Sequence, residues 1–458
     1  MATASTTNDK ALSSVVNVDS AVNRGIWHAQ TLSPNAAETV NQVLQENHYK
    51  HHIFFSYMDK EGVHMHNHIV HHILTLFALG ADRAEIQRLY DVNLDYQRDA
   101  VPEQKDMIKD LSNSAAYKKA QGDEDNYMSF VKFYEDEITA KGVPAVIQEY
   151  VFAEDHRADD MLVRLFMGFL HPIIHLGCGL EFKQPAIVAE ALAQAAVHDD
   201  NYLFTFFHEA EARATVPGTP RKTLAELLDL AHGSEKCRNA SNSQVREKVR
   251  DGVLLNAKEE AMQLAAQYEV PEGEVDLRMA ELCNATAYIV AGAQRAKKAP
   301  RMDFFLMHPM NMSIFFGTFV RIPWISRAAK ARLLTYAGRF SLILYIDMGA
   351  PKLDLDIIRT YKPTRAEGTW ADAIRRGMAH PDDGHASKMI RAVLYAEQVS
   401  KPYEARPEFR MKGTDFEKFA IAIVDSLNPA GGKAGPYEDE SWIRGAGFDD
   451  VWEQVPST

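Results

Sequence analysis

Histidine is the residue type that stands out in this sequence of 458 residues. The chain holds 18 histidines, and eight of them lie between His48 and His72, far more than an even scatter would place there. Imidazole is the commonest protein ligand for transition metals and the usual side chain for proton transfer near neutral pH. The cluster therefore indicates a metal site or an acid–base site.

Within the cluster, His68 and His72 have the spacing of two ligands on one helix face. Zinc proteases use the same spacing with a glutamate directly after the first histidine. Here that position is Ile69, so the base of those enzymes is absent. The alternative interpretation is a helix end whose histidines bond to neighbouring polar groups or face solvent.

His171 and His175 repeat this spacing around Pro172. His175 lies between Ile174 and Leu176, so we expect it to be buried, and a buried imidazole needs a polar partner. A metal could be that partner, and a hydrogen-bonded core histidine is the alternative.

Two further segments offer imidazole. His308 lies in an apolar run that starts at Asp303, and a core histidine is again the alternative there. His385 and Lys388 are three residues apart and share a helix face, which a solvated helix start would explain as well. Four histidine ligands, one from each of these segments, would suit iron, copper, zinc or nickel.

Carboxylates are missing from these four segments at any obvious ligand spacing. Asp382 and Asp383 directly precede Gly384, and we expect them to cap the following helix. The sequence therefore does not contain the usual iron-binding triad of two histidines and one carboxylate at its common spacing.

Composition excludes several function classes. The net charge of −13 and the pI near 5.8 argue against a nucleic-acid partner and against docking on an anionic membrane. Three scattered cysteines form no disulfide or zinc pattern, and the first residues show no secretory signal, so we expect a cytoplasmic protein. No glycine-rich dinucleotide fingerprint occurs.

The elements that must position these residues read as helices. Apolar residues recur with helical periodicity in most segments, and alternation typical of strands is scarce. We predict an all-α fold with a flexible lead-in at 1–35, one large helical domain at 36–458 and an irregular C-terminal loop. The helices expected to carry or adjoin the histidines cover 36–46, 64–80, 143–170, the run after Pro185, 242–269, 326–347 with a break near Gly338, and 384–401.

Several longer motifs occur in order from about residue 64 to residue 452. They are HNHIVHHILTLFALGA, HPIIHLGCGLEF with AEALAQAAVH, DFFLMHPMN, DDGHASKMIRA and SWIRGAGFDDVW. These motifs resemble the questin oxidase family, whose members open the central ring of anthraquinones with molecular oxygen in fungal secondary metabolism.

The resemblance implies a non-haem iron enzyme with four histidine ligands and a carboxylated lysine. Which of His68, His71 and His72 binds stays open, as does the choice between His171 and His175, although the apolar neighbours of His175 favour it. Lys388 would carry the carboxyl group, and with His385 it is our expectation for the catalytic residues. The implied metal ligands are therefore His68, His72, His175, His308, His385 and Lys388.

A carbamate on Lys388 makes chemical sense. A dry site beside a dication favours the neutral amine, which reacts with carbon dioxide, and the resulting anion supplies the hard oxygen ligand that the sequence otherwise lacks. Fe(II) would then keep one position for dioxygen or a phenolate. NADPH, if it is needed, would reduce the quinone outside the protein.

The expected partners are O2 and a small aromatic polyketide, an anthraquinone or its hydroquinone, and the oligomeric state is left open. Two other functions stay in view: an NADPH-dependent oxidoreductase of a related pathway, and a zinc-binding or non-enzymatic helical protein. Aromatic side chains could wall the pocket, with Asn67, Asn311 and Arg391 as polar groups. The aromatic candidates are Phe304, Phe305, Phe315, Phe316 and Trp370.

Overall fold

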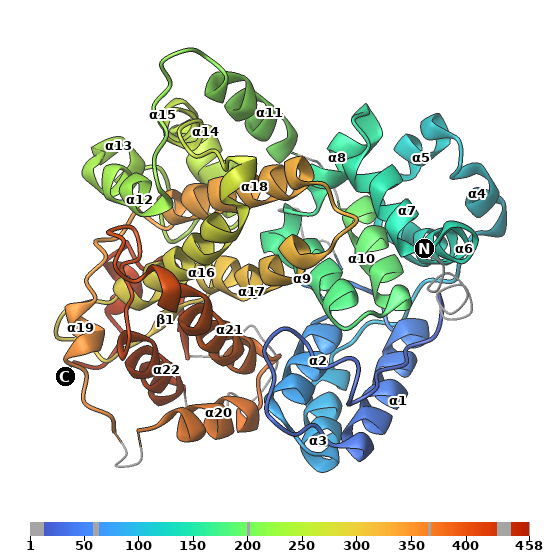
Figure 1. The fold of residues 1–458 in the computed structure, drawn as a ribbon, viewed down its shortest axis with the longest axis horizontal. Coiled ribbons are helices and arrows are strands. Elements are labelled where there is room, and N and C mark those ends of the chain that lie inside the picture. Colours follow the sequence, from blue (N-terminus) through green and yellow to red (C-terminus); the bar gives the residue numbers. More distant parts are fainter. Residues whose placement is uncertain (1–12, 58–63, 199–201, 365–367, 428–440, 458) are drawn as a thin grey trace. The chain divides into compact units, whose positions relative to one another are not determined.

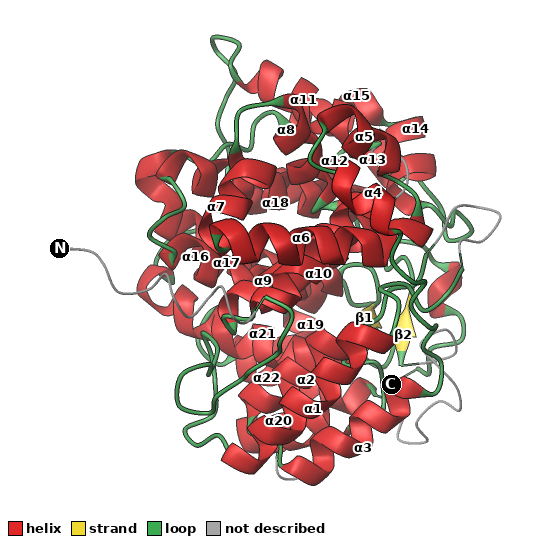
Figure 2. Cartoon of the chain, turned by 90° about the vertical axis from the view of Figure 1, so that its right-hand side faces the viewer, coloured by secondary structure: helices red, strands yellow, loops and turns green. Residues whose placement is uncertain are grey.

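The computed structural model describes residues 13–57, 64–198, 202–364, 368–427 and 441–457. Its chain divides into two compact units. Unit 1 comprises residues 1–204 with 321–325, and unit 2 comprises 205–320 with 326–458. The described residues are mainly helical, which confirms the all-α fold class (Figure 2).

Unit 1 packs its helices around an alanine-rich central helix, α10, which contacts both α6 and α9 (Figure 1). Pro185 stands in the first turn of α10, where its missing N–H costs nothing. The helices of unit 1 are α1 Pro34–Lys50, α2 Ile69–Leu79, α3 Arg83–Leu94, α4 Lys105–Asp110, α5 Ser114–Ala120, α6 Tyr127–Lys141, α7 Val143–Ile147, α8 His156–Arg164, α9 Met167–Glu181 and α10 Pro185–Val197, with the short turns η2 Glu124–Asn126 and η3 Gln148–Phe152.

Unit 2 is built around α16, which packs against α18 and α21. Its helices are α11 Leu203–Ala214, which starts in unit 1, α12 Leu224–Gly233, α13 Glu235–Arg238, η4 Lys248–Val253, α14 Leu254–Asn256, α15 Lys258–Ala265, η5 Glu272–Glu274, α16 Val275–Gly292, α17 Met307–Arg321, α18 Arg327–Asp347, α19 Asp356–Arg359, α20 Trp370–Ala379, α21 His385–Ser400, η6 Lys401–Tyr403, α22 Asp415–Ser426 and η7 Asp450–Trp452.

One short parallel pair of strands ties the C-terminal segment to the start of α17. It consists of β1 Met302–Asp303 and β2 Trp442–Ile443. Asp303 strengthens this link because its carboxylate accepts the backbone N–H groups of Phe305, Leu306, Gly445 and Ala446. The irregular C-terminal loop is thus anchored beside His308, although residues 428–440 lie outside the described part of the chain.

The segment before α1 differs from the flexible lead-in that composition predicts. Residues 13–33 lack regular structure, but Val16 and Val18 are buried. The backbone N–H groups of these two residues bond to Gln45 and Asn41 on α1. Residues 1–12 are not described.

Helix boundaries follow the sequence signals in part. The predicted helix over 143–170 is divided into α7, η3, α8 and the start of α9, and the one over 242–269 into η4, α14 and α15. The helix over 64–80 and the break near Gly338 differ as well. Gly80, with φ at 93°, ends α2 as expected. The predicted helix over 64–80 begins only at Ile69, because residues 64–67 extend along residues 53–55. The predicted break near Gly338 is wrong. This glycine instead lets the Tyr268 ring pack directly on α18, where a Cβ atom would lie 2.0 Å from the ring.

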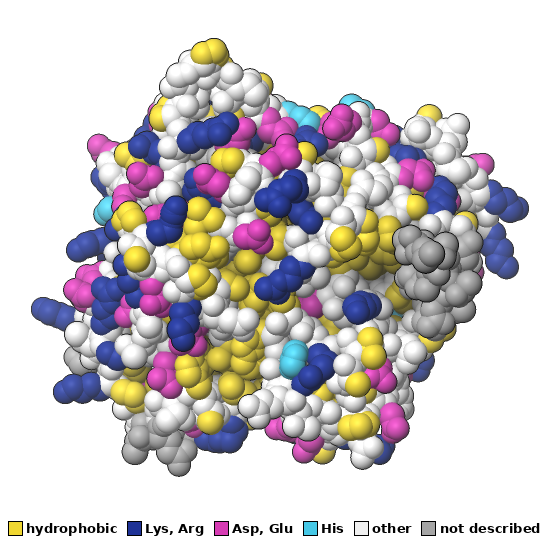
Figure 3. Space-filling view, viewed as in Figure 1, with side chains coloured by type: hydrophobic (Ala, Val, Ile, Leu, Met, Phe, Trp, Pro, Cys, Tyr) yellow, Lys and Arg dark blue, Asp and Glu magenta, His cyan; other side chains and the backbone are white. Residues whose placement is uncertain are grey.

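In the described residues no single helix is both long and apolar enough to cross a membrane. Among the described helices, α8 and α9 meet that length and composition together, as a pair bent by 96°. Over the face shown in Figure 3, lysine and arginine side chains are interspersed with aspartate and glutamate.

Candidate functional site

In unit 1, His68 precedes α2 rather than lying within it. Asn67 accepts the backbone N–H of Ile69 through its side chain at 2.9 Å, which stabilises the start of the helix. The Nε2 atom of His68 then lies 2.6 Å from Nε2 of His171. His72 takes a different direction and contacts the Asn93 amide on α3 at 3.2 Å. The i,i+4 spacing therefore does not bring His68 and His72 to one point.

His171 owes its position to a left-handed turn at the start of α9. Gly168, Phe169 and Leu170 all have positive φ, and the Gly168 carbonyl lies 2.5 Å from Nδ1 of His171. Donation from Nδ1 to this carbonyl leaves Nε2 as the lone-pair nitrogen, the one that faces His68. This tautomer suits a metal ligand.

A second close pair stacks on the first. His66 and His198 bring their Nε2 atoms to 2.9 Å, and the His66 ring lies on the His171 ring with centroids 3.9 Å apart. Gly168 allows this crowding, because a Cβ atom there would lie 2.3 Å from Nε2 of His198. Four buried imidazoles of unit 1 thus gather around one turn.

His175 belongs to a different set of contacts. Its Nδ1 atom lies 3.2 Å from Nε2 of His71, and its Nε2 atom lies 2.7 Å from a carboxylate oxygen of Glu190. Each of these two histidines thus has one ring nitrogen on an acceptor of the protein and the other toward an imidazole, His171 toward His68 and His175 toward His71. The choice between His171 and His175 as a ligand stays open.

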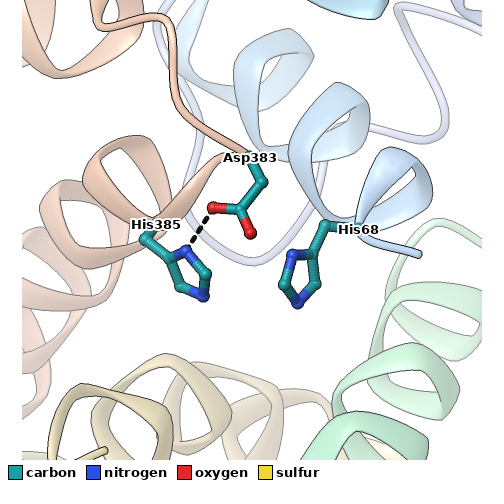
Figure 4. A group of neighbouring side chains, drawn as sticks. All are labelled: His68, Asp383 and His385. Atoms are coloured by element: carbon teal, nitrogen blue, oxygen red, sulfur yellow. Dashed lines mark hydrogen bonds and ion pairs between the residues drawn. The ribbon is translucent and has the colours of Figure 1, made fainter. Parts of the chain in front are cut away.

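In unit 2, His385 is the first residue of α21 and follows Gly384, whose φ is 93°. Asp382 caps the helix by accepting the N–H groups of Gly384 and Ala386, as expected. Asp383 does not cap. Its carboxylate bonds to Nδ1 of His385 (Figure 4), and both side chains are buried. His68, which is also drawn, belongs to unit 1.

The Asp383 contact fixes the tautomer of His385. Burial lowers the pKa of His385 to about 4, with Asp383 opposing the shift and the charge of Lys388 adding to it. The imidazole is therefore neutral at neutral pH. With Nδ1–H donated to Asp383, Nε2 carries the lone pair.

His308, in the first turn of α17, has the same tautomer for a different reason. Its Nδ1 atom donates to the Phe304 carbonyl at 2.7 Å, and its ring centroid lies 5.3 Å from that of His385. Asn311 lies one turn further on and is 3% exposed. Neither its amide oxygen nor its amide nitrogen has a hydrogen-bond partner among the described residues. Asn311 can thus offer a donor and an acceptor to a bound molecule.

Lys388 lies one turn after His385 and is buried, as is Arg391 after it. Of the proposed polar groups, Asn67 is occupied by the contacts at the start of α2. Asn311, whose amide has no partner among the described residues, is therefore better placed than Asn67 to meet a substrate.

The aromatic candidates divide into two groups. The Phe304 ring lies 5.2 Å from the His308 ring and 5.1 Å from the His385 ring, and Trp442 approaches His385 at 6.4 Å. Phe316 packs on Phe319 inside unit 2, and Trp370 starts α20 at the surface. Phe304, an expected aromatic candidate, flanks the imidazoles. Trp442, which the sequence alone does not indicate, lies beside His385 as well.

Two carboxylates that contact histidine side chains are not apparent from the sequence. The sequence predicts a helix cap at Asp383 and gives no signal at Glu190, yet each carboxylate lies against a ring nitrogen of a histidine, Asp383 at His385 and Glu190 at His175. The pattern Asp-x-His was visible at 383–385. Glu190 lies 15 residues after His175 on another helix, so only the packing of α9 on α10 reveals it.

The chain resembles known proteins over most of its length. The model of the questin oxidase-like family matches residues 65–393. A Baeyer-Villiger oxidase of Pestalotiopsis fici is 38% identical over 427 residues, covering 92% of this chain and 93% of its own. A questin oxidase of Aspergillus terreus is 36% identical over 438 residues, covering 94% and 96% respectively. An oxidoreductase of Aspergillus parasiticus is 34% identical and covers 92% of this chain and 83% of its own.

Proposed function

Because the chain belongs to the questin oxidase-like family and is an oxidoreductase, we propose that it is an iron-dependent oxygenase that opens the central ring of an anthraquinone-type polyketide. The observation that carries this proposal is the buried pair of imidazoles in unit 2, His308 and His385, each held by a hydrogen bond at Nδ1. The names of the relatives, oxidase and monooxygenase, support the reaction class.

The donor set fits iron in its chemistry. Metal-bound histidines commonly donate the second ring nitrogen to a carboxylate or a backbone carbonyl, and His385 and His308 do these two things respectively. Iron accepts imidazole readily and, when bound, supplies the spin-allowed reaction with O2 that an organic substrate lacks. Neutral His385, which burial favours, keeps its lone pair for a metal.

The full ligand set remains a proposal that rests on the sequence motifs. It comprises His308, His385 and Lys388 from unit 2 together with histidines of unit 1. From unit 1 we propose His68 with His171, the pair whose Nε2 atoms meet. His72 and His175 stay as ligands to be tested by substitution. Iron content measured in variants of each unit decides which residues are required.

Lys388 is proposed to carry a carboxyl group. Its buried position one turn after His385 disfavours the charged amine, and carbamylation converts that cation into an anion. An anionic oxygen donor beside neutral imidazoles would balance part of the charge of a dication.

Substrate binding is proposed to use Asn311 and Phe304. The free amide of Asn311 can donate to a quinone carbonyl and accept from a phenol, while Phe304 presents a ring to a flat polycyclic molecule.

The overall reaction balances without a flavin. A quinone reduced by two electrons and two protons, with NADPH as the reductant outside the protein, gives a hydroquinone. The hydroquinone then takes up both atoms of O2 as one carbon–carbon bond of the central ring breaks. This yields one ring-opened molecule with a carboxylic acid on one outer ring and a phenol on the other. No water is consumed or released in the second step.

Isotope labelling tests this function against the alternative that the relatives' names suggest. A Baeyer–Villiger oxygenase inserts one oxygen atom next to the carbonyl and releases the other as water, and hydrolysis of the lactone then adds an oxygen atom from solvent. We expect chemically reduced substrate under 18O2 to give a ring-opened acid with two labelled oxygens, without NADPH. One labelled oxygen, located on the phenol, would support the Baeyer–Villiger route instead.

A further inference from the structure

A cavity in unit 2 lies between the end of α11, the loop after α15 and the first part of α18 (Figure 1). Its volume is about 490 Å³, which is within the range of small-molecule sites. The proposed metal ligands are not among its lining residues. Part of its wall is apolar and is formed by Ala214, Val270, Pro271, Ala328 and Ala331.

Arg339 on α18 lines this cavity, although the residue is only 1% exposed. Both hydrogen bonds of its side chain come from Nε, which donates to the carbonyls of Ala265 at 3.1 Å and Tyr268 at 3.2 Å. The Nη1 atom has no hydrogen-bond partner among the described residues. One edge of a buried guanidinium is therefore unused at the cavity.

The positive charge of Arg339 lacks a carboxylate partner among the described residues. Glu211 and Glu269 act on this charge, but each forms its ion pair with another arginine. The carbonyls of Ala265 and Tyr268, at and just after the end of α15, supply only partial negative charge. Burial lowers the pKa of the Arg339 guanidinium, yet an arginine side chain stays charged near neutral pH. A buried cation is costly unless an anion completes its surroundings.

The other charged side chains of the cavity decide which anion fits. Arg332 binds Glu211 through two contacts, from Nε to Oε1 at 2.7 Å and from Nη2 to Oε2 at 3.1 Å. Arg221 pairs with Glu269 at 2.7 Å, and Glu272 is exposed. These carboxylates repel a dianion such as phosphate, whereas one carboxylate group matches the one guanidinium that has no counter-ion.

We propose that this cavity binds a small monocarboxylic acid, with its carboxylate on Nη1 of Arg339 and its apolar body against the alanine and valine side chains of the wall. Hydrogen bonds between a guanidinium and a carboxylate are stronger than neutral ones and fix the orientation of the ligand. The apolar part of the wall favours an aryl or short alkyl group as the body of the acid. The site does not depend on the proposed oxygenase chemistry.

A purely structural role explains only part of this arrangement. The bonds from Nε to the Ala265 and Tyr268 carbonyls tie α18 to the end of α15, but a neutral donor could make them as well. A water molecule could accept from Nη1, but it would leave the charge of Arg339 without a counter-ion. A bound monocarboxylate accounts for both the donor and the charge.

The first experiment asks whether the full-length protein binds such an anion. Benzoate is the probe in isothermal titration, with benzamide as the uncharged analogue and inorganic phosphate as the dianion. We expect saturable binding of one benzoate per chain, with benzamide and phosphate weaker by roughly tenfold or more. No binding of benzoate, or equal binding of benzamide, would overturn the proposal. Tighter binding of phosphate would overturn it as well, because the site would then select a dianion.

The second experiment locates the bound benzoate. Arg339→Met removes the guanidinium and keeps a long side chain, so the affinity for benzoate should fall by roughly tenfold or more. Lys330→Met is the matched control, because it removes a buried cation from the same helix at a position that does not line the cavity. It should change the affinity by less than about twofold. Equal losses in the two variants would show that benzoate responds only to net charge, and the proposal would be wrong.

Ala328→Leu keeps the test decisive if Arg339→Met fails to fold. Ala328 is an exposed residue of α18 that lines the cavity, so leucine occupies part of the cavity and leaves Arg339 and its hydrogen bonds in place. Leucine is a good helix former, so the fold should persist. We expect the affinity for benzoate to fall by roughly fivefold or more. Unchanged affinity would place benzoate outside this cavity and contradict the proposal, whether or not the chain is an oxygenase.

Discussion

Asp383 determines which ring nitrogen His385 can offer to a metal, because its carboxylate bonds to the Nδ1 atom and leaves Nε2 available. The sequence predicts that Asp383 caps the helix together with Asp382, because both directly precede the residue before the helix start. The structure divides these roles: Asp382 accepts two backbone N–H groups, and Asp383 holds the imidazole. Two neighbouring aspartates with different partners cannot be told apart from composition or spacing.

Asp383→Ala should weaken iron binding by roughly 10- to 100-fold, since it removes the carboxylate that orients a proposed ligand. Asp382→Ala is the matched control. It removes a cap and should cost about 1 kcal/mol of unfolding free energy while iron affinity stays near that of the wild type. Metal titration and urea unfolding of both variants check this. Equal losses of iron affinity would show that Asp383 acts only through the stability of α21.

Lys388→Arg tests the carbamate. Arginine keeps the positive charge but cannot react with carbon dioxide, so we expect it to lose iron and turnover as completely as Lys388→Ala does. Short carboxylic acids added to the Ala variant should partly restore both by supplying an oxygen donor. Wild-type activity in the Lys388→Arg variant would show that no carbamate on Lys388 is needed.

At the scale of elements, the irregular turns matter more than the helices. The sequence periodicity located most helices, and it placed all four imidazole segments in or beside them. It did not reveal that α2 starts one residue after His68, or that Gly168, Phe169 and Leu170 form a left-handed turn. Both features depend on contacts between segments distant in sequence, which helical periodicity does not encode.

Gly168→Ala should destabilise unit 1 and separate its stacked imidazoles. Alanine disfavours the φ of 51°, and its Cβ atom would lie 2.3 Å from His198 and 2.6 Å from His66. We expect a loss of about 2 kcal/mol or more in urea unfolding. Gly218→Ala is the control, because its φ is 89° but nothing lies within 4 Å of the added atom. A loss no larger than that of the control would show that the turn opens without strain.

At the scale of the whole molecule, the buried charges make stability depend on pH. Burial lowers the pKa of His48, but its bonds to Glu135 and Glu190 outweigh this effect and raise the pKa to about 9 in the folded chain, above its ordinary value of 6.5. Its contribution is therefore complete below about pH 6.5 and is lost as the pH rises through 9. The loss amounts to about 3 kcal/mol. Urea unfolding between pH 6 and 10 should show this decline in the wild type and a flatter curve in His48→Gln. Parallel curves would assign the decline to other groups.

The overall fold class followed from the sequence because helical periodicity is local, and so did the family resemblance, because its motifs are contiguous. The contacts that hold each compact unit together did not, since they join residues distant in sequence. Nor did the chain from Glu135 through His48 and Glu190 to His175, which joins residues on four helices. Such contacts exist only once the helices pack.

The most direct test of the central claim is an iron titration of protein purified without a histidine tag and stripped of metal. Ring opening of chemically reduced anthraquinone in the presence of O2 is measured after each addition of Fe(II), with zinc as the parallel metal. We predict that turnover rises in proportion to added iron, stops rising at one iron per chain, and stays absent with zinc. Turnover that is complete without iron, or that zinc restores equally well, would contradict the account.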